Sequence, residues 1–278
     1  MPQGGSGTMA LPLAALPPPD KADQPWPNPE SGLPTTNLKL DFDGVAAPGY
    51  TLKTWHPTFI AQAVLAEFAA TTWPALASAY IKVHDQIESA HTIDQEIRIL
   101  LYLAAAERPA RIGEIIAQAE DARPYWAFLL GGNPVAIPFT WALVEIGMAV
   151  GQMTGMYFKK HYNRPRPSHY YPGLITPIPT PGHPSYPNNH ALQSLLASRC
   201  VSLVFEQKNA DGSFKSTRPG LTEPLKALAI RVGQNREVAG VHFPSDREAS
   251  KSICAAIMES LPDCPTFDMV LKEAKKEW

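Results

Sequence analysis

The sequence has few charged residues and no excess of either sign. Charged residues make up 18% of the 278 residues, and the formal net charge at pH 7 is −2. A chain with this balance offers no broad field that would attract nucleic acid or an anionic membrane, so we expect no nucleic-acid partner. A local basic cluster within residues 159–166 points instead to a small anionic ligand.

Cysteine is scarce as well. Cys200, Cys254 and Cys264 are odd in number and show no CxxC spacing of the kind that binds metal. We expect buried free thiols, which favour a reducing compartment, although one disulfide with a remaining thiol stays open. The start of the chain lacks the positive region and apolar core of a signal peptide, and the choice between cytoplasm and periplasm is left undecided.

Long hydrophobic runs are limited to residues 135–158. This segment has Glu145 as its one charged residue and also contains Pro138, Gln152 and three glycines. A membrane-spanning helix needs about 20 predominantly apolar residues. The polar residues and the glycines favour a buried helix of a bundle, so we predict a soluble protein without a transmembrane span.

The alternating pattern of β-strands is nearly absent, and no internal repeat is visible. Residues 1–35 contain nine prolines and predict an extended arm, whereas residues 36–278 predict a helical domain. The predicted fold class is therefore all-α, a single helical bundle with an extended Pro-rich N-terminal arm. Arms of this kind often wrap a partner subunit, so a homo-oligomer formed through the arm stays an open expectation.

Apolar spacing and breaker residues predict the helix positions. We expect one helix from Pro57 to a break at Trp73-Pro74, and others over about 75–89, 93–107, 111–130 with a break near 123, 137–161, 188–207, 222–240 and 246–260. Thr92 with Gln95 and Ser245 with Glu248 fit capping boxes. Residues 162–187 contain eight prolines and predict a long loop without a helix, and long ordered loops are usually functional.

Three short segments combine the residue types that bind an oxyanion. They cover residues 159–167, 187–190 and 235–246, and they contribute three cations, two histidines and one carboxylate: Lys159, Arg166, Arg236, His190, His242 and Asp246. Cations and N–H donors neutralise the equatorial oxygens of phosphate or vanadate. One histidine can attack or ligate the central atom, and the other can move a proton at the opposite apex.

These segments resemble the signature of the superfamily that contains type 2 phosphatidic acid phosphatases, bacterial class A acid phosphatases and vanadium haloperoxidases. The family pattern has Lys, six residues and Arg-Pro; then Pro-Ser-Gly-His; then Ser-Arg, five residues, His, three residues and Asp. The first spacing begins at Lys159 and the third at Arg236. Asn188 and Asn189 stand where the family has Ser and Gly, and Asn235 replaces the Ser before the arginine. The resemblance also implies an all-α fold.

The resemblance implies catalytic roles for the histidines and the aspartate. His242 corresponds to the nucleophile of the phosphatases and to the metal ligand of the vanadium enzymes. His190 corresponds to the general acid, at the start of a helix whose N–H groups favour an anion. Asp246, four residues after His242, can accept from Nδ1 and leave Nε2 unprotonated for attack.

The remaining matches are expected to bind the oxyanion. Lys159, Arg166 and Arg236 would hold its oxygens, together with donors at Asn188 and Asn189. An Asn amide can replace a Ser hydroxyl as donor, but the side chain at 189 occupies space that the ligand needs.

Three further residues lie near these segments. We expect Arg164 to be structural and to pair with a carboxylate. His183 and Tyr186 precede the second segment, and two interpretations stay open for them: lining the pocket, or a structural or surface position.

Three functions remain open at this stage. We favour a phosphomonoester hydrolase that forms a phosphohistidine at His242 and needs no metal or cofactor, because only 45 residues separate His190 from Arg236, which resembles the small acid phosphatases. The first alternative is a vanadium haloperoxidase, with vanadate on His242, that oxidises halide with peroxide. The second is a non-catalytic oxyanion-binding protein weakened by Asn188 and Asn189. The expected ligand is a small phosphorylated substrate, phosphate or vanadate.

Overall fold

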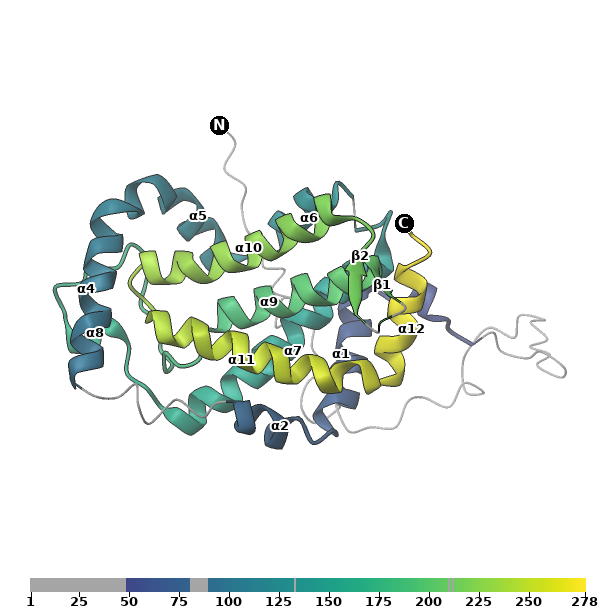
Figure 1. The fold of residues 1–278 in the computed structure, drawn as a ribbon, viewed down its shortest axis with the longest axis horizontal. Helices are drawn as coiled ribbons and strands as arrows, with labels where there is room; N and C mark the ends of the chain where they lie inside the picture. Colours follow the sequence, from purple (N-terminus) through teal and green to yellow (C-terminus); the bar gives the residue numbers. More distant parts are fainter. Residues whose placement is uncertain (1–48, 81–89, 133, 210, 212) are drawn as a thin grey trace, which may run out of the picture. The chain divides into compact units, whose positions relative to one another are not determined.

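The computed structural model describes residues 49–80, 90–132, 134–209, 211 and 213–278 (Figure 1). Residues Tyr50–Trp278 form one unit. The predicted arm at residues 1–35 and the domain boundary at 36 lie outside the described residues and remain predictions.

The described residues are mainly helical, which confirms the all-α prediction. In chain order the helices are α1 (Pro57–Ala69), α2 (Trp73–Tyr80), α4 (Ala90–Ala106), α5 (Arg108–Glu120), α6 (Arg123–Leu130), α7 (Pro138–Tyr162), α8 (Pro167–Tyr170), α9 (Asn189–Ser202), α10 (Pro219–Val238), α11 (Pro244–Ser260) and α12 (Pro265–Ala274). Short 3-10 turns cover Leu52–Thr54, Leu203–Phe205 and Leu261–Asp263. Strands β1 (Glu206–Lys208) and β2 (Phe214–Ser216) pair antiparallel, with Gln207 opposite Lys215.

Proline sets the beginning of many of these helices. Helices α1, α5, α6, α7, α8, α10, α11 and α12 each have a proline at the first or second helical position. Proline is suited to this place because its φ angle is already helical and the missing N–H would have no partner there. The predicted breaks at 73 and 123 are therefore the starts of α2 and α6.

Two predicted helix starts are wrong, because each helix begins before the residue that was expected to cap it. Helix α11 begins at Pro244, so Ser245 lies in the first turn, where its N–H and hydroxyl donate to Glu96 instead of capping the helix. Helix α4 begins at Ala90, two residues before the expected cap Thr92. The predicted helix over 75–89 is described only as far as Tyr80, the end of α2.

Some short elements were not predicted. The loop 162–187 contains one helical turn, α8. Helix α9 ends at Ser202, and the chain continues through a 3-10 turn into β1, where a helix was expected to residue 207. Helix α12 was not predicted either. The turn α8 and the 3-10 turn are too short for a periodic pattern to show. Helix α12 has 10 residues, and its buried Phe267, Val270 and Ala274 have helical spacing, so the omission of this helix is an error of the prediction.

Helix α9 lies at the centre of the packing. It contacts α7, α10 and α11, and α7 also contacts α1 and α12 (Figure 1). Glycine permits the close approach of α7 to α9, because a Cβ at Gly147 would lie 2.3 Å from the backbone nitrogen of Ala197. This packing fixes the first turn of α9, which carries His190, against its neighbours.

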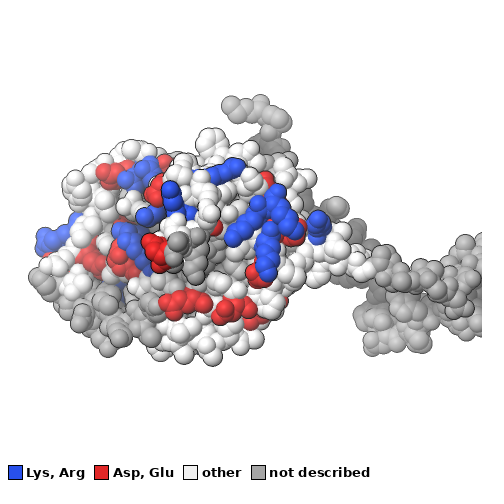
Figure 2. All heavy atoms as spheres, turned by 45° about the vertical axis from the view of Figure 1, so that its right-hand side comes forward, with Lys and Arg blue, Asp and Glu red and all other residues white. Residues whose placement is uncertain are grey.

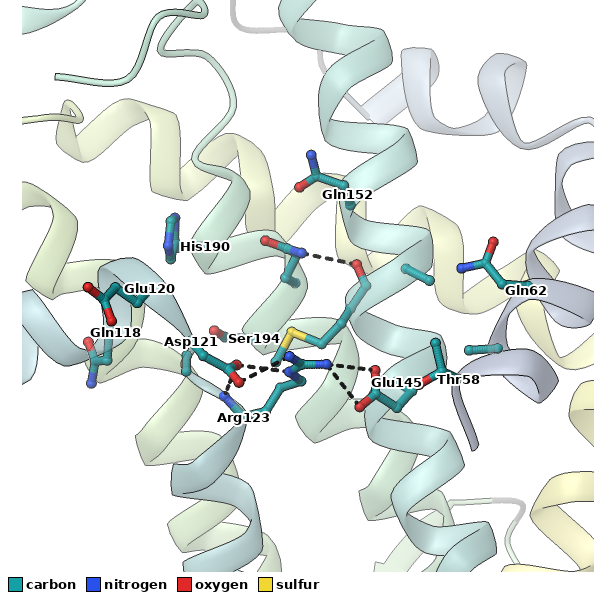
Figure 3. A pocket seen from close by; sticks show the side chains of 15 residues that line it. Thr58, Gln62, Gln118, Glu120, Asp121, Arg123, Glu145, Gln152, His190 and Ser194 are labelled. Atoms are coloured by element: carbon teal, nitrogen blue, oxygen red, sulfur yellow. Dashed lines mark hydrogen bonds and ion pairs between the residues drawn. The ribbon is translucent and has the colours of Figure 1, made fainter. Parts of the chain in front are cut away.

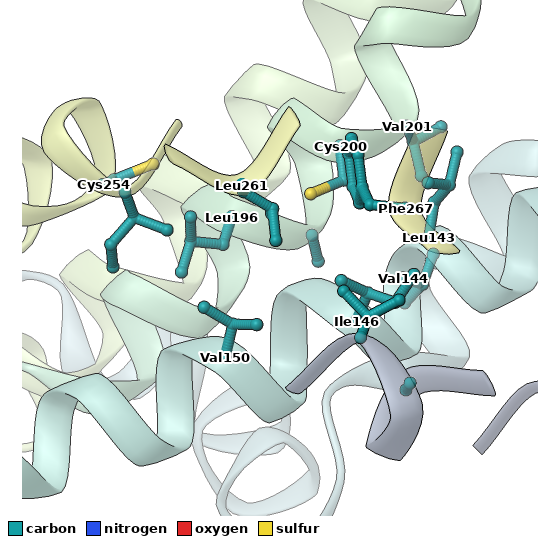
Figure 4. Packing of buried hydrophobic residues seen from close by; sticks show 14 of the residues in the cluster. Leu143, Val144, Ile146, Val150, Leu196, Cys200, Val201, Cys254, Leu261 and Phe267 are labelled. Carbon is teal, nitrogen blue, oxygen red and sulfur yellow. The ribbon is translucent and has the colours of Figure 1, made fainter. Parts of the chain in front are cut away.

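The core around these helices is apolar. Figure 4 shows Leu143, Val144 and Val150 of α7 in one cluster with Leu196, Cys200 and Val201 of α9. Each large apolar side chain that is fully buried stabilises the fold by roughly 1.5–3 kcal/mol. All three cysteines are free and buried, as the sequence predicted.

No helix of the described residues is long and apolar enough to cross a membrane. On the face drawn in Figure 2, basic and acidic side chains lie beside one another and do not gather by sign.

Candidate functional site

The three sequence segments meet at one cavity of about 550 Å³, which we call the anion cavity. Arg166 follows α7, His190 lies in the first turn of α9, Arg236 lies in the last turn of α10, and His242 lies between α10 and α11. All four line the cavity, together with Asn189. Residues from four separate parts of the fold therefore face one enclosed space that is rich in N–H donors.

His242 is held by Asp246 in a defined orientation. Its Nδ1 lies 3.0 Å from Oδ2 of Asp246, and the same carboxylate oxygen accepts from the backbone N–H of Phe243 at 3.0 Å. The hydrogen bonds from these groups and the charge of Arg164 hold the pKa of Asp246 well below its usual range, despite complete burial. An ionised carboxylate can only accept, so Nδ1 of His242 carries the proton.

The other nitrogen of His242 is an acceptor. Nη1 of Arg166 lies 2.9 Å from Nε2 of His242, and a guanidinium can only donate. Burial and the charge of Arg166 lower the pKa of His242 well below its ordinary value. The imidazole is therefore neutral, and its Nε2 lone pair accepts from Arg166 at the cavity.

Arg164 has the structural role expected for it. Its guanidinium donates to Asp246 at 2.7 Å, to Glu96 at 3.0 Å and to the hydroxyl of Ser245 at 2.8 Å, and it lies 4.0 Å from the ring centre of Phe243. Arg164 thus fixes the carboxylate that orients His242. Glu96 was not predicted as a site residue, because nothing in its local sequence marks it as the partner of a residue 68 positions away.

Arg236 has donors without partners. Its Nη2 donates to the carbonyl of Ile115 at 2.8 Å, whereas Nε and Nη1 are buried and have no partner among the described residues. Burial lowers the pKa of Arg236 to about 10, so the group remains charged at neutral pH. Unpaired buried donors are rare because each costs free energy. A bound anion in the cavity would supply the acceptors that Arg236 lacks.

Each nitrogen of the Arg166 guanidinium has a protein partner. Its Nε donates to the carbonyl of His183 at 2.9 Å, Nη1 donates to the carbonyl of Val241 at 2.7 Å, and Nη2 lies 3.1 Å from Nδ1 of His183. His183 also lines the cavity. Tyr186 instead belongs to the buried core, where its ring packs edge-on against Tyr162.

His190 faces the cavity from the first turn of α9. Burial and the neighbouring charge of Arg236 lower the pKa of His190 to about 3, while a hydrogen bond with the backbone of Gln118 acts in the opposite direction. The side chain of His190 is therefore neutral at pH 7. A bound phosphate dianion would favour the protonated form, which is the form a general acid needs.

The stability of the folded chain should depend on pH through these histidines. Below pH 6.5 the unfolded chain takes up protons that half-buried His190 and buried His242 resist in the folded state. The contribution of these histidines to stability is therefore constant above about pH 6.5 and falls as the pH drops towards 3. We expect the Tm to decrease from pH 7 to pH 4.5, and to decrease less in His190→Gln. The exposed control His161→Gln should keep the wild-type slope; equal slopes in all three proteins would contradict the burial of His190.

Lys159 holds the loop before α9. Its buried ammonium donates to three backbone carbonyls, those of Pro184 at 2.7 Å, Ser185 at 2.9 Å and Pro187 at 2.6 Å. Burial and the charge of Arg166 lower the pKa of Lys159 well below its ordinary value. Lys159 is absent from the described residues that line the anion cavity. The predicted contact between Lys159 and an oxyanion would require one of these three bonds to break.

Replacing Lys159 should therefore affect folding. Lys159→Met leaves three buried carbonyls without a donor, and we expect the free energy of unfolding to fall by about 3 kcal/mol or more. Denaturant unfolding followed by circular dichroism measures this change. The neighbouring exposed Lys160 supplies the control, because Lys160→Met should change the free energy of unfolding by less than about 0.5 kcal/mol. Equal stabilities of the two variants would exclude this role of Lys159.

The two asparagines of the second segment have different environments. Asn188 caps α9: its Oδ1 accepts from the N–H of Ala191 at 3.1 Å and its Nδ2 donates to the carbonyl of Gly233 at 3.2 Å. Its amide is thus committed to the fold, and the predicted role of this side chain as a donor to the oxyanion has no support in the geometry. Asn189 lines the cavity and packs on Gly155, with Nδ2 donating to Gln152 at 3.1 Å.

Comparison with known proteins agrees with this geometry. Residues 139–262, which include all three segments, match the family model described as the PAP2 superfamily. Over 155 residues, the chain is also 28% identical to a non-specific acid phosphatase of Salmonella typhi. This aligned region covers 52% of this chain and 55% of that protein. The chain thus spans about half the length of this curated relative.

These matches bear on the alternatives raised by the sequence. The superfamily predicted from the spacing of Lys159, Arg166, Arg236, His242 and Asp246 is confirmed. The relative is named as an acid phosphatase, and nothing in the comparisons favours a vanadium haloperoxidase. In the PAP2 region and the rest of the described chain, no group of three or more His, Cys, Asp or Glu side chains could hold a metal ion.

Proposed function

We propose that this chain is a phosphomonoester hydrolase that forms a phosphohistidine at His242. The observation that carries the proposal is that one cavity is lined both by a guanidinium with unpaired donors and by a histidine oriented to act as a nucleophile. Arg236 presents two unpaired donors, and His242 presents a neutral ring whose Nε2 bears a lone pair. The similarity to an acid phosphatase supports the same reaction class.

In the first step, the phosphoryl oxygens would accept from Arg236 and Arg166. Arg166 would then give up its hydrogen bond to His242, so substrate binding uncovers Nε2. Nε2 attacks phosphorus in line and the bond from phosphorus to the ester oxygen breaks. His190, protonated in the presence of the dianion, transfers its proton to the leaving oxygen. Asp246 stabilises the positive ring of the phosphorylated His242 through Nδ1.

In the second step, a water molecule attacks the phosphorus of the phosphohistidine. Neutral His190 takes a proton from this water, the bond from phosphorus to Nε2 breaks, and inorganic phosphate leaves. His242 returns to its neutral form, and Arg166 can again donate to it. The positive groups act throughout by stabilising the charge on the equatorial oxygens.

The test is a rapid-quench experiment with p-nitrophenyl phosphate and with a ³²P-labelled phosphomonoester. The proposal predicts steady release of phosphate and a transient, alkali-stable, acid-labile label on the protein that is absent from His242→Ala. Release of phosphate without any labelled protein would rule out the phosphohistidine. If orthophosphate binds but no ester is hydrolysed, the chain is an oxyanion-binding protein and the proposed activity is wrong.

A further inference from the structure

A second cavity, of about 350 Å³, adjoins the anion cavity at His190 (Figure 3). The two cavities share four lining residues: Glu120, Gln152, His190 and Gln193. Figure 3 shows His190 on one side of this second cavity, with Thr58 and Gln62 of α1 on the opposite side. His190 therefore stands between the cavity of the nucleophile and a second space that extends towards α1.

The second cavity is lined mainly by hydrogen-bonding groups. Its described lining includes four glutamines, two hydroxyl side chains and three carboxylates, and it contains no Phe, Tyr or Trp. Its apolar part is limited to Ala61, Ala122, Met148 and Ala149. Ligand pockets are usually lined mostly by apolar and aromatic side chains, so this lining is suited to a polar, non-aromatic ligand.

One wall of the second cavity contains a network of ion pairs. Arg123 donates to Asp121 at 2.9 Å and to Glu145 at 3.2 Å, and these bonds appear as dashed lines in Figure 3. Two carboxylates share a single guanidinium, so their oxygens retain capacity to accept from a ligand.

One amide donor among the lining residues has no partner in the described part of the chain. Gln118 is 1% exposed; its Oε1 accepts from Asn235 at 2.9 Å, while its Nε2 has no partner among the described residues. A buried amide donor without a partner costs free energy unless a ligand or water satisfies it. The second cavity thus offers both donors and acceptors, which matches the hydroxyl group, since a hydroxyl can donate and accept.

We propose that this second cavity binds the leaving group and selects phosphate monoesters of polyhydroxylated alcohols, such as sugar phosphates. The proposal rests on the proposed phosphatase function. In an in-line reaction the nucleophile and the leaving oxygen occupy opposite apices. His242 would be at one apex and the acid His190 at the other, so the alcohol portion extends past His190 into the second cavity. A long alkyl group there would leave the polar lining desolvated and unpaired.

The experiment compares kcat/KM for glucose 6-phosphate with kcat/KM for n-hexyl phosphate. We expect the wild-type protein to prefer the sugar phosphate by at least about tenfold, which corresponds to one or two hydrogen bonds. In Thr58→Val/Gln62→Leu, one wall becomes apolar, and we expect this preference to fall by about tenfold. Gln207→Leu, an exposed change on β1, is the matched control and should keep the wild-type preference.

Three outcomes would overturn the proposal. The first is an equal or greater kcat/KM for hexyl phosphate in the wild-type protein. The second is an unchanged preference in the double variant, and the third is a stronger preference for O-phosphoethanolamine, which would assign the carboxylates to an ammonium group. Failure of the phosphatase function itself looks different, because no ester would then release phosphate, whatever its alcohol.

Discussion

Replacing His242 with alanine is expected to reduce phosphate release from p-nitrophenyl phosphate by about 10⁴-fold or more. The reason is that the variant removes the neutral Nε2 that attacks phosphorus, while Arg236 and its unpaired donors remain. Binding of orthophosphate, measured by calorimetry, should therefore persist. His161→Ala, an exposed histidine at the end of α7, is the control and should keep full activity. Activity of His242→Ala within about tenfold of wild type would remove His242 from the mechanism.

Arg236→Met is expected to lower kcat/KM by about 10²- to 10³-fold without lowering the stability of the ligand-free protein. The guanidinium makes one hydrogen bond, to Ile115, and leaves two buried donors unsatisfied. A methionine of similar shape would fill the same space without that cost. We therefore expect the free energy of unfolding in phosphate-free buffer to be unchanged or higher, and the stabilisation of the wild-type protein by added phosphate to be lost.

Arg164→Met is the matched control for Arg236. Both arginines are buried, but Arg164 is paired with Asp246 and Glu96. Its removal leaves two buried carboxylates without their cation, so we expect the free energy of unfolding to fall by about 3–5 kcal/mol. Denaturant unfolding of both variants decides between the two cases. A loss of stability in Arg236→Met as large as that in Arg164→Met would show that Arg236 is a structural cation and not an anion-binding one.

The site could be predicted from the sequence because its residue types and spacings are specific. The four-residue step from His242 to Asp246 places the carboxylate on Nδ1, and the structure has this bond at 3.0 Å. The positions of the long helices were also readable, since apolar periodicity and prolines mark where they begin. The convergence of Arg166, Arg236 and His242 on one cavity followed from the resemblance and not from any local pattern.

The sequence could not predict which groups each cationic side chain contacts. Lys159 and Arg236 are equal members of the sequence signature, yet the first donates to three carbonyls of the loop 184–187 and the second keeps two donors unpaired. This difference depends on where backbone carbonyls lie after folding. The N-cap of α9 was readable, because Asn188 and Asn189 are both suitable caps for a helix that begins there, and the structure has Asn188 in this place.

The second cavity could not be predicted from the sequence for the same reason. Its lining comes from α1, α5, α6, α7 and α9, and the glutamines that contribute to it have no shared spacing. Arg123 and Glu145 are 22 residues apart and pair only because α6 packs against α7.

A crystal structure with orthovanadate bound tests the central claim most directly. We expect vanadium on Nε2 of His242, with the equatorial oxygens accepting from Nε and Nη1 of Arg236, and Arg166 moved from Nε2 to the oxyanion. His190 should lie next to the oxygen at the opposite apex. Vanadate bound elsewhere, with the two donors of Arg236 still unpaired and Arg166 still on His242, would contradict the assignment of this cavity as the phosphate site.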